Sequence, residues 1–459
     1  MNYQVILLSA LLSLLGSTRV LGEELDLGSA MARAREQARE VTAARARAEA
    51  GDRRASQAKA YRLPSVSLQE IWIRTDSPAD AFGLLLNQER FSLSEFAAGD
   101  PNDPVTTENA TTRLALSLPV YTGGELSGRI RQARLAAEAT HDTAAWIEEG
   151  AALSAGEAYI RLAQIREQVA LLEHSLATVH AHVQLARAYV DQGMLVRSEL
   201  LRAEVELSRL EDLSSQARGQ AKVAEANLSF RLGADFSTAW QLEPLSDPVP
   251  LNGELAEWFD DADSRLDLSA AQRMLAAGEL EVKVKKSGLL PKIGLVARRD
   301  WNDDELFGSN GDSTSIMAVA NIDLFSGGRH RAAAAAARSE ADAARSDIEQ
   351  FRAGIRLAIK DAFEKASSSR ERHLTALAAQ ESAREVERIT RERFKKGIVK
   401  TIDLLDATTQ RREAEMRELM ARAEAHLASL ALAVEAGRRP ESVLPPTTTT
   451  TTTTNTRTE

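Results

Sequence analysis

The two halves of this chain repeat the same series of short motifs in the same order. Leu-Pro-Val-Tyr-Thr-Gly-Gly is echoed by Ile-Asp-Leu-Phe-Ser-Gly-Gly, and Gly-Met-Leu is echoed by Gly-Ile-Val. Three pairs of landmarks share one fixed offset along the sequence: 118–124 with 322–328, Gly193 with Gly397, and Gly233 with Gly437. A fixed offset across separate landmarks indicates an internal duplication, so the chain is expected to fold as two similar repeats.

Each repeat contains long runs in which apolar residues recur with heptad spacing. In the first repeat the run is Ala155, Ala158, Leu162, Ile165, Val169, Leu172, Leu176, Val179, Val183, Ala186 and Val190. A seven-residue apolar repeat favours a left-handed coiled coil. A second run follows Gly193, so we predict two long antiparallel helices that meet at a tight glycine turn. Helical hairpins are therefore predicted over 125–230 and, in the second repeat, over 329–436.

Short alternating segments precede the two Gly-Gly pairs. Apolar residues alternate with other residues there, which is typical of a strand with one face toward lipid or a core. With their partner segments they predict four strands per chain, near 64–75, 111–121, 291–299 and 315–325. Four strands are too few to close a membrane barrel. Lipid cannot form hydrogen bonds with the backbone groups of an open sheet edge, so several chains must combine their strands in one barrel.

The N-terminal residues resemble a secretory signal. The apolar run from Val5 to Leu15 is too short to span a bilayer, and Val-Leu-Gly ends at a cleavage site that we place after Gly22. Residues 1–22 are therefore predicted to be a signal peptide that directs export. A buried N-terminal helix is the alternative interpretation.

These features divide the rest of the chain into segments. The first repeat spans 23–233, and the second spans 264–437, with a proline-containing linker over 234–263. Residues 76–110 are extra sequence in the first repeat and would form a long loop at the outer end of the barrel, either functional or only self-packed. The tail, 438–459, contains a threonine run that cannot bury a core and is expected to be disordered.

Composition and motifs argue against several functional classes. The formal net charge of −10 and the lack of a basic stripe disfavour nucleic acid as a partner. The chain has no cysteine, which removes disulfides, thiol catalysis and Cys-ligated metals. His174, His180 and His182 lie close in sequence, but residues two apart on a helix do not share a face. With no phosphate-binding loop or serine-nucleophile motif, we expect no enzyme activity, no cofactor and no metal.

The ordered set of motifs resembles the TolC family of outer-membrane efflux proteins. The matching features are the paired repeats, the two strand-to-helix turns that end in Gly-Gly, Gly193-Met-Leu and, above all, the run from Gly397 to Thr408. The resemblance covers about Leu25 to Gly437. It implies a mainly α fold with membrane β structure, in which a homotrimer closes one 12-stranded β-barrel that continues into a long coiled-coil α-helical barrel.

The same resemblance implies a function and a location. The chain would be the exit duct of a tripartite efflux or secretion system, embedded in the bacterial outer membrane and extending into the periplasm. It would conduct substrates passively, with a periplasmic adaptor protein, an inner-membrane transporter and outer-membrane lipid as partners. A coiled-coil scaffold without a channel is the alternative. The signal and the duplicated strand and Gly-Gly unit count against that alternative.

The tips of the two hairpins would form the periplasmic entrance and the adaptor-docking surface. The candidate docking residues are Gly193, Met194, Leu195, Gly397, Ile398 and Val399. Exposed apolar residues beside a turn need a partner to cover them. An ordinary hairpin turn closed by a small apolar plug is the alternative interpretation.

Asp403 and Asp406 match acidic positions that line the closed entrance in the family. Spaced i and i+3 near a helix start, they share one face, and a trimer would gather them around one axis where they attract cations. Asp403 could also complement the helix dipole behind a cap at Thr401.

The first repeat departs from this acidic pair. It offers Glu199 and Arg202 at the corresponding positions, and we include both among the gate candidates. Arg197, Arg202 and Lys400 are candidates to bridge to the acidic residues and hold the tip shut, with solvation as the alternative.

Overall fold

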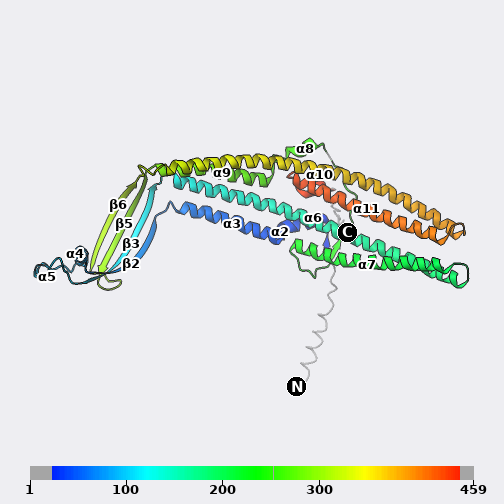
Figure 1. Ribbon diagram of the computed structural model, residues 1–459, viewed down its shortest axis with the longest axis horizontal. Coiled ribbons are helices and arrows are strands. Elements are labelled where there is room, and N and C mark those ends of the chain that lie inside the picture. Colours follow the sequence, from blue (N-terminus) through cyan, green and yellow to red (C-terminus); the bar gives the residue numbers. More distant parts are fainter. Residues whose placement is uncertain (1–22, 252, 445–459) are drawn as a thin grey trace, which may run out of the picture. The chain divides into compact units, whose positions relative to one another are not determined.

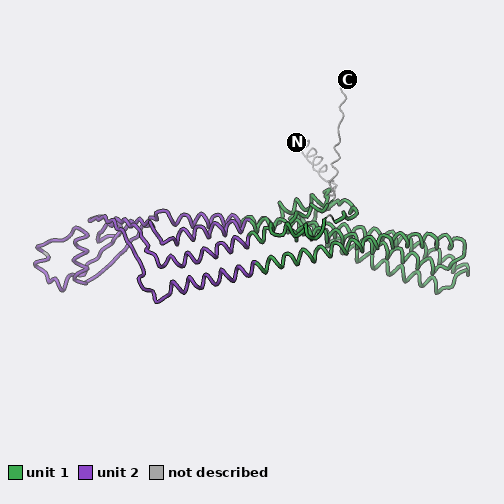
Figure 2. The backbone as a smooth tube through the Cα atoms, turned by 90° about the horizontal axis from the view of Figure 1, so that it is seen from above, with its two compact units in different colours: residues 1–46, 142–269, 349–459 green, residues 47–141, 270–348 purple. Residues whose placement is uncertain are grey.

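The computed structural model describes residues 23–251 and 253–444, which form two compact units (Figures 1 and 2). The described part of unit 1 comprises 23–46, 142–269 and 349–444, and unit 2 comprises 47–141 and 270–348. The fold is mostly helical with a few strands, as the sequence predicts. None of the helices within these ranges combines the length and the apolarity needed to cross a bilayer. The predicted signal peptide lies outside the described residues.

Unit 2 contains a four-stranded antiparallel sheet. Its strands are β2 (Ser65–Thr75), β3 (Thr107–Tyr121), β5 (Lys292–Asp303) and β6 (Gly311–Asn321), in the order β2-β3-β5-β6. Leu68 pairs with Leu114 across β2 and β3, and Leu295 pairs with Ala318 across β5 and β6. The β3 ladder shifts register between Pro119 and Tyr121, where proline has no N–H to donate.

The two faces of this sheet differ in chemistry. The register places a set of apolar side chains on one face, here called the apolar band: Val66, Leu68, Leu114, Leu116, Leu118, Leu295 and Ile316. The opposite face carries polar pairs, including Arg113 with Asp300 at 2.8 Å and Thr111 with Asn302 at 2.9 Å. Period-two alternation thus gives one face with an apolar band that suits lipid and one mixed face that contains polar pairs.

The last strand differs from its predicted position. We predicted 315–325, but β6 begins at Gly311 and ends at Asn321. Asn321 pairs with Lys292, the first residue of β5, so the ladder has no partner beyond this point. The alternation continues past Asn321 in the sequence, but pairing decides where the strand ends. Leu324 and Phe325 consequently leave the sheet and are 90% and 91% exposed.

The extra segment of the first repeat is self-packed. It contains α4 (Pro78–Asn87) and α5 (Leu93–Ala98), and its last residues belong to β3 rather than to a loop. The rings of Phe82, Phe91 and Phe96 pack with centroids 5.2 to 5.6 Å apart. Gln88 is buried and donates through Nε2 to the backbone oxygen of Glu108 at 2.8 Å, which fastens α4 to the sheet.

Four helices complete unit 2, and all of them also have residues in unit 1. They are α3 (Arg39–Ala60), α6 (Glu125–Asp191), α9 (Leu266–Lys286) and α10 (Arg329–Lys395). Figure 1 shows α9 between α6 and α10. Gln132 of α6 donates to the backbone oxygen of Ala277 and to Glu281 in α9, and Arg345 of α10 pairs with Glu279 of α9 at 2.7 Å.

Unit 1 is built around two helical hairpins. The first joins α6 to α7 (Arg197–Leu232), and the second joins α10 to α11 (Thr401–Glu435). Leu172, Val179 and Val183 of the heptad run in α6 are buried in one cluster with Ala203 and Leu210 of α7. Arg412 of α11, itself buried, pairs with Glu206 of α7 at 2.8 Å and ties the hairpins together.

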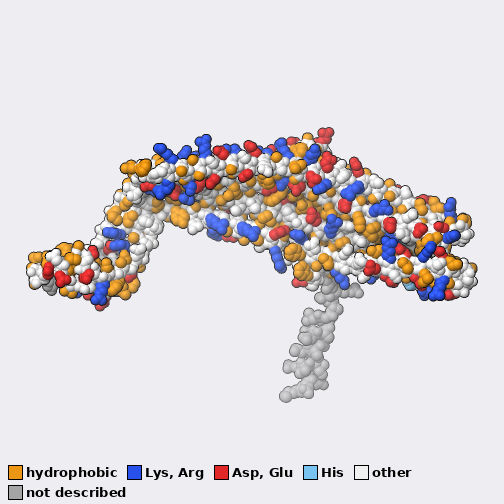
Figure 3. Space-filling model, viewed as in Figure 1, with side chains coloured by type: hydrophobic (Ala, Val, Ile, Leu, Met, Phe, Trp, Pro, Cys, Tyr) orange, Lys and Arg blue, Asp and Glu red, His pale blue; other side chains and the backbone are white. Residues whose placement is uncertain are grey.

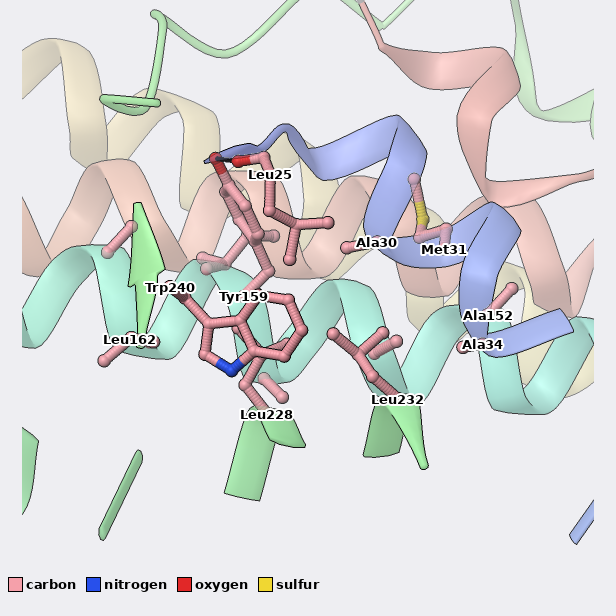
Figure 4. Close-up of a cluster of buried hydrophobic side chains, with 14 of the residues drawn as sticks. Leu25, Ala30, Met31, Ala34, Ala152, Tyr159, Leu162, Leu228, Leu232 and Trp240 are labelled. Carbon is pink, nitrogen blue, oxygen red and sulfur yellow. Dashed lines mark hydrogen bonds between the residues drawn. The ribbon is translucent and has the colours of Figure 1, made fainter. Parts of the chain in front are cut away.

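Residues of 23–37 and of the linker between the repeats lie in a common core (Figure 4). β1 (Glu23–Leu25) pairs in parallel with β4 (Trp240–Leu242), and α2 (Leu27–Gln37) packs beside them. The segment 234–263 also contains α8 (Leu255–Asp260) and begins a short 3₁₀ turn at Ala262–Ser264. It is therefore a folded part of unit 1 rather than a plain linker.

The residues after α11 extend the fold further than predicted. We placed the start of the disordered tail at 438, but a 3₁₀ turn spans Pro440–Val443. Glu441 pairs with Arg35 at 2.8 Å, and Arg438 pairs with Asp261 at 2.6 Å. These ion pairs join residues that are far apart in the sequence and leave no local sequence pattern. This explains why we placed the start of the tail too early. The threonine run lies outside the described residues.

Replacing Tyr159 by phenylalanine is expected to destabilise unit 1 by about 1–3 kcal/mol, because the backbone oxygens of Leu25 and Glu243 lose their donor and the hydrogen bond to Leu25 is buried. The Tyr159 side chain is 1% exposed, and its hydroxyl donates to the backbone oxygens of Leu25 at 3.2 Å and Glu243 at 3.0 Å. Thermal unfolding followed by helical circular dichroism measures the loss. Tyr61→Phe, at a 64% exposed position, is the control and should change nothing.

The same hydroxyl gives a pH signature. Burial raises the pKa of Tyr159 to about 12 from its ordinary value of 10.0. Because the raised pKa favours the protonated form in the folded chain, its contribution is complete below pH 10.0 and is lost as pH rises toward about 12. Tyr159→Phe should lack this alkaline loss, and an unchanged alkaline profile in that variant would contradict the assignment.

Candidate functional site

The two hairpin tips are closed by the same backbone turn. Gly193 has φ 71° and Gly397 has φ 69°, both in the left-handed region that favours glycine. At the first tip the N–H of Met194 donates to the oxygen of Tyr189 at 2.9 Å, and at the second tip the N–H of Ile398 donates to Arg393 at 3.0 Å. Each hydrogen bond satisfies a terminal helix carbonyl, as a glycine C-cap requires.

The predicted docking residues lie at these tips, but they are not equally exposed. Met194 and Ile398 are 63% and 67% exposed, whereas Leu195 and Val399 are half-buried. Val196, which we did not single out, is 64% exposed beside them. The tips therefore present a small apolar surface of three side chains on two separate turns.

Asp403 caps the helix that follows the second tip. Its carboxylate accepts the backbone N–H of Lys400 at 2.9 Å. Lys400, and not Thr401, is the N-cap residue, because α11 begins at Thr401. A lysine side chain has no acceptor, so Asp403 supplies the capping oxygen from the third helical position.

Asp406 lies one turn further along the same face. Both carboxylates are exposed, whereas the intervening Leu404 and Leu405 are buried against the hairpin. The i and i+3 spacing thus places the two acidic side chains together on the face of α11 that its own chain leaves open.

The predicted bridges to these acids do not form within one chain. Arg202 lies 3.7 Å from Glu199, its neighbour on α7. Within the described ranges, neither Asp403 nor Asp406 makes an ion pair, and Lys400 contacts Asp403 only through its backbone N–H. The acidic pair of the second repeat therefore has no basic partner among the residues that the structure describes.

A buried charged seam along α10 and α11 was not predicted. Arg384 pairs with Glu415 at 3.0 Å, Arg411 with Glu387 at 3.2 Å, and His373 with Glu418 at 3.2 Å. The three glutamates are between 4% and 8% exposed. Arg411, Glu415 and Glu418 follow the helix period on α11, but Arg384 and Glu387 lie on α10, so the seam depends on a neighbouring helix that a local period does not show.

The seam borders a groove of about 560 Å³ within unit 1. Its lining includes Glu167 and His174 of α6, Asp247, and the seam residues Arg384 and Glu415. Acidic and basic side chains are interspersed along the helices in general (Figure 3). No cluster suited to a metal ion is found among the described residues, including His174, His180 and His182.

Sequence comparison identifies the class of protein. A profile of the outer membrane efflux protein family matches residues 30–234 and 262–438, which is most of the chain in two separate segments. The chain belongs to this family. It is an outer-membrane efflux protein of the TolC-like channel type, located in the outer membrane and extending into the periplasm. Members of this family are channels rather than enzymes.

Individual relatives agree with this assignment. Outer membrane efflux protein BepC of Brucella suis is 27% identical over 335 residues, which cover 72% of this chain and 72% of BepC. Alkaline protease secretion protein AprF of Pseudomonas aeruginosa is 22% identical over 259 residues, which cover 55% of this chain and 54% of AprF.

Solved structures share the fold. A membrane protein from Pseudomonas aeruginosa matches with a TM-score of 0.76 at 18% identity, covering 90% of this chain and 93% of that one. The outer membrane protein VceC from Vibrio cholerae matches with a TM-score of 0.72 at 18% identity, covering 90% of this chain and 96% of VceC. At these identities the likeness establishes the fold alone.

Proposed function

We propose that three copies of this chain form the exit duct of a tripartite efflux or secretion system. The supporting observation is the sheet of unit 2, which has an apolar band on one face, polar pairs on the other, and two unpaired edges at β2 and β6. Lipid offers no partner for those edges, so the strands of neighbouring chains must pair with them. Three chains of four strands give the 12-stranded barrel of the family resemblance.

The two long hairpins of each chain would continue the barrel as a helical tube. Matched left-handed glycines support two internal repeats of one structural plan, since Gly193 and Gly397 at the tips, and Gly233 and Gly437 after the returning helices, all have positive φ. As the family resemblance implies, such a duct would conduct passively, and the inner-membrane transporter would supply the energy. A scaffold without a channel does not account for a sheet with one lipid-compatible face.

The apolar tip residues would bind the periplasmic adaptor, which connects the duct to an inner-membrane transporter. Met194 and Ile398 each expose most of their side chain beside a rigid turn. Burial of such a side chain contributes roughly 1.5–3 kcal/mol, enough for tight docking when several chains present the same surface.

A double substitution at the tips tests this part of the proposal. Met194→Asp with Ile398→Asp, expressed in the bacterium that makes this chain and in place of the native copy, is expected to lower export by about tenfold or more, which corresponds to roughly 1.4 kcal/mol of docking energy. Gln192→Asp adds a charge at the same tip without removing an apolar side chain and should export normally. Normal export by the double variant, with outer-membrane abundance unchanged, would contradict docking at the tips.

A further inference from the structure

The extra segment of the first repeat contains a pocket that the proposed duct does not use. The segment lies at the end of the sheet away from the start of α6, where α4 and α5 extend beyond the strands (Figure 1). The pocket has a volume of about 520 Å³, which is within the range of small-molecule sites. It is lined by α4, α5, the loop after α5, the start of β3 and Asp304, all within unit 2. One chain therefore supplies the whole site.

Part of the pocket lining is aromatic. Phe82, Phe91 and Phe96 pack against one another and all three line the pocket. Phe82 and Phe96 remain 38% and 41% exposed, and Leu85 is half-buried. Val105, also in the lining, is 87% exposed. Such a lining suits a ligand with an aromatic or apolar body, and phenyl faces also attract cations.

Gln88 supplies a buried hydrogen-bond acceptor. It lines the pocket and is 1% exposed. Its Nε2 donates to the backbone oxygen of Glu108 and to Oδ1 of Asn109, each at 2.8 Å. Because both partners are acceptors, the amide has to present its nitrogen to them. Its Oε1 is therefore left buried without a hydrogen-bond partner among the described residues, and a ligand that donates to it would gain a hydrogen bond that the chain does not make.

The Gln88 amide is held in position by the sheet. Gly311, the first residue of β6, approaches the end of α4 so closely that a Cβ there would lie 2.0 Å from the oxygen of Asn87. Asn109 donates in turn to Oγ1 of Thr111 at 2.7 Å, which connects the amide to the polar face of the sheet. The acceptor is thus fixed before a ligand arrives, so little ordering cost opposes binding.

The charged lining of the pocket is mainly acidic. It comprises Asp100, Asp103, Glu108 and Asp304, together with Arg90. Arg90 pairs with Asp304, and Glu108 pairs with Arg74 at 3.5 Å. Asp100 and Asp103 are exposed and make no ion pair within the described ranges. They lie in one turn, in which the Asp103 N–H donates to the backbone oxygen of Asp100 at 3.1 Å. The two carboxylates favour a cationic ligand.

We infer that this pocket binds small cationic amphiphiles, namely primary amines with an aromatic or apolar body. The body packs against Phe82 and Phe96, and the ammonium group donates to Gln88 Oε1 in the field of Asp100 and Asp103. An anion would be repelled by the two carboxylates, and a hydrocarbon would leave Gln88 Oε1 unpaired. The inference goes beyond the proposed duct and does not depend on it, because the site lies within one chain.

Titration calorimetry of the purified protein with tryptamine tests the inference. Tryptamine carries an ethylammonium chain on an indole ring, 3-ethylindole is its neutral analogue, and indole-3-propionate carries a carboxylate instead. After subtraction of heats from detergent alone, tryptamine is expected to bind saturably with a Kd of about 1 mM or tighter. Both analogues should bind at least about tenfold more weakly. Equal affinity of the three compounds, or no saturable binding of tryptamine, would overturn the inference.

Two matched double variants locate the binding. Asp100→Asn with Asp103→Asn is expected to weaken tryptamine binding by about tenfold and to leave 3-ethylindole unaffected. Asp76→Asn with Asp80→Asn removes the same charge from exposed positions of the same segment outside the pocket lining, and should bind tryptamine normally. An equal loss in both variants would mean that tryptamine responds to surface charge in general and that the pocket is assigned wrongly.

A methylated probe tests the role of Gln88 without changing the protein. N,N,N-trimethyltryptammonium keeps the positive charge but has no N–H on the ammonium group. It should bind at least about tenfold more weakly than tryptamine, because it cannot donate to Gln88 Oε1. Binding as tight as that of tryptamine would reject Gln88 as the acceptor. None of these measurements requires the chain to conduct, so their outcome is separate from that of the duct proposal.

Discussion

Replacing Leu116 with arginine is expected to keep the chain out of the outer membrane, whereas Ser117→Arg is expected to insert normally. Leu116 lies in the apolar band on the central strand β3, paired with Ala297 and Val66. Ser117 is the next residue and lies on the opposite face, paired with Val296 and Ser65. An arginine on the lipid face near the membrane midplane costs about 2–4 kcal/mol for each chain, and every chain of the assembly carries it.

The measurement is the fraction of each variant recovered as folded oligomer in outer membranes, at matched expression. The pair is well controlled because both changes add the same side chain one residue apart. Equal insertion of the two variants would mean that the apolar band does not face lipid. A failure confined to Ser117→Arg would reverse the assignment of the faces.

Removing the charges of Asp403 and Asp406 is expected to lower the preference of the pore for cations by about tenfold, within the range in which charged clefts concentrate ions. Both carboxylates are exposed on one face of α11 and have no ion-pair partner within the described part of a single chain. The effect should fade at high salt, since screening acts over about 8 Å at 0.15 M and about 3 Å at 1 M. Reversal potentials in asymmetric salt measure it.

Asparagine and alanine substitutions separate charge from capping. Asp403→Asn keeps an oxygen that can accept the Lys400 N–H, whereas Asp403→Ala loses a cap worth about 1 kcal/mol. If the acidic pair is a gate, Asp403→Asn with Asp406→Asn should lose selectivity as fully as the double alanine variant. If only the alanine variant changes, Asp403 acts as a cap alone. Glu413→Ala, an exposed acid further along α11, is the control.

The fold class could be predicted because its elements have strong periods. The heptad residues Leu172, Val179 and Val183 are buried where a coiled-coil seam requires them. The alternation of Leu114 and Leu116 places them on one face of a strand. The glycines at the hairpin tips have the left-handed conformation for which glycine is needed. The spacing of apolar residues and the glycines of tight turns are local features, so a single sequence is enough to identify them.

Other features depend on partners distant in sequence and could not be predicted. The end of β6 is set by where β5 begins, and Glu441 folds back because Arg35 lies within reach. The charged seam pairs Glu387 of α10 with Arg411 of α11 and Glu415 of α11 with Arg384 of α10, so both of its ion pairs join two helices. Buried charges on a helix follow the same period as apolar residues, but their burial depends on opposite charges from a neighbouring helix.

The candidate site was predicted in position but not in all contacts. Gly193, Gly397 and the acidic pair lie at the tips, since tight turns and helix starts have clear local signals. The bridges from Arg197, Arg202 and Lys400 to the acids are not made within one chain, because helix geometry directs Arg202 to Glu199 instead.

Single-channel conductance of the purified mature protein in planar bilayers, with its mass in detergent, tests the central claim most directly. The account predicts a trimer that produces discrete, cation-sensitive conductance steps. A monomer or dimer without conductance, despite intact helical structure, would contradict the duct and favour the scaffold.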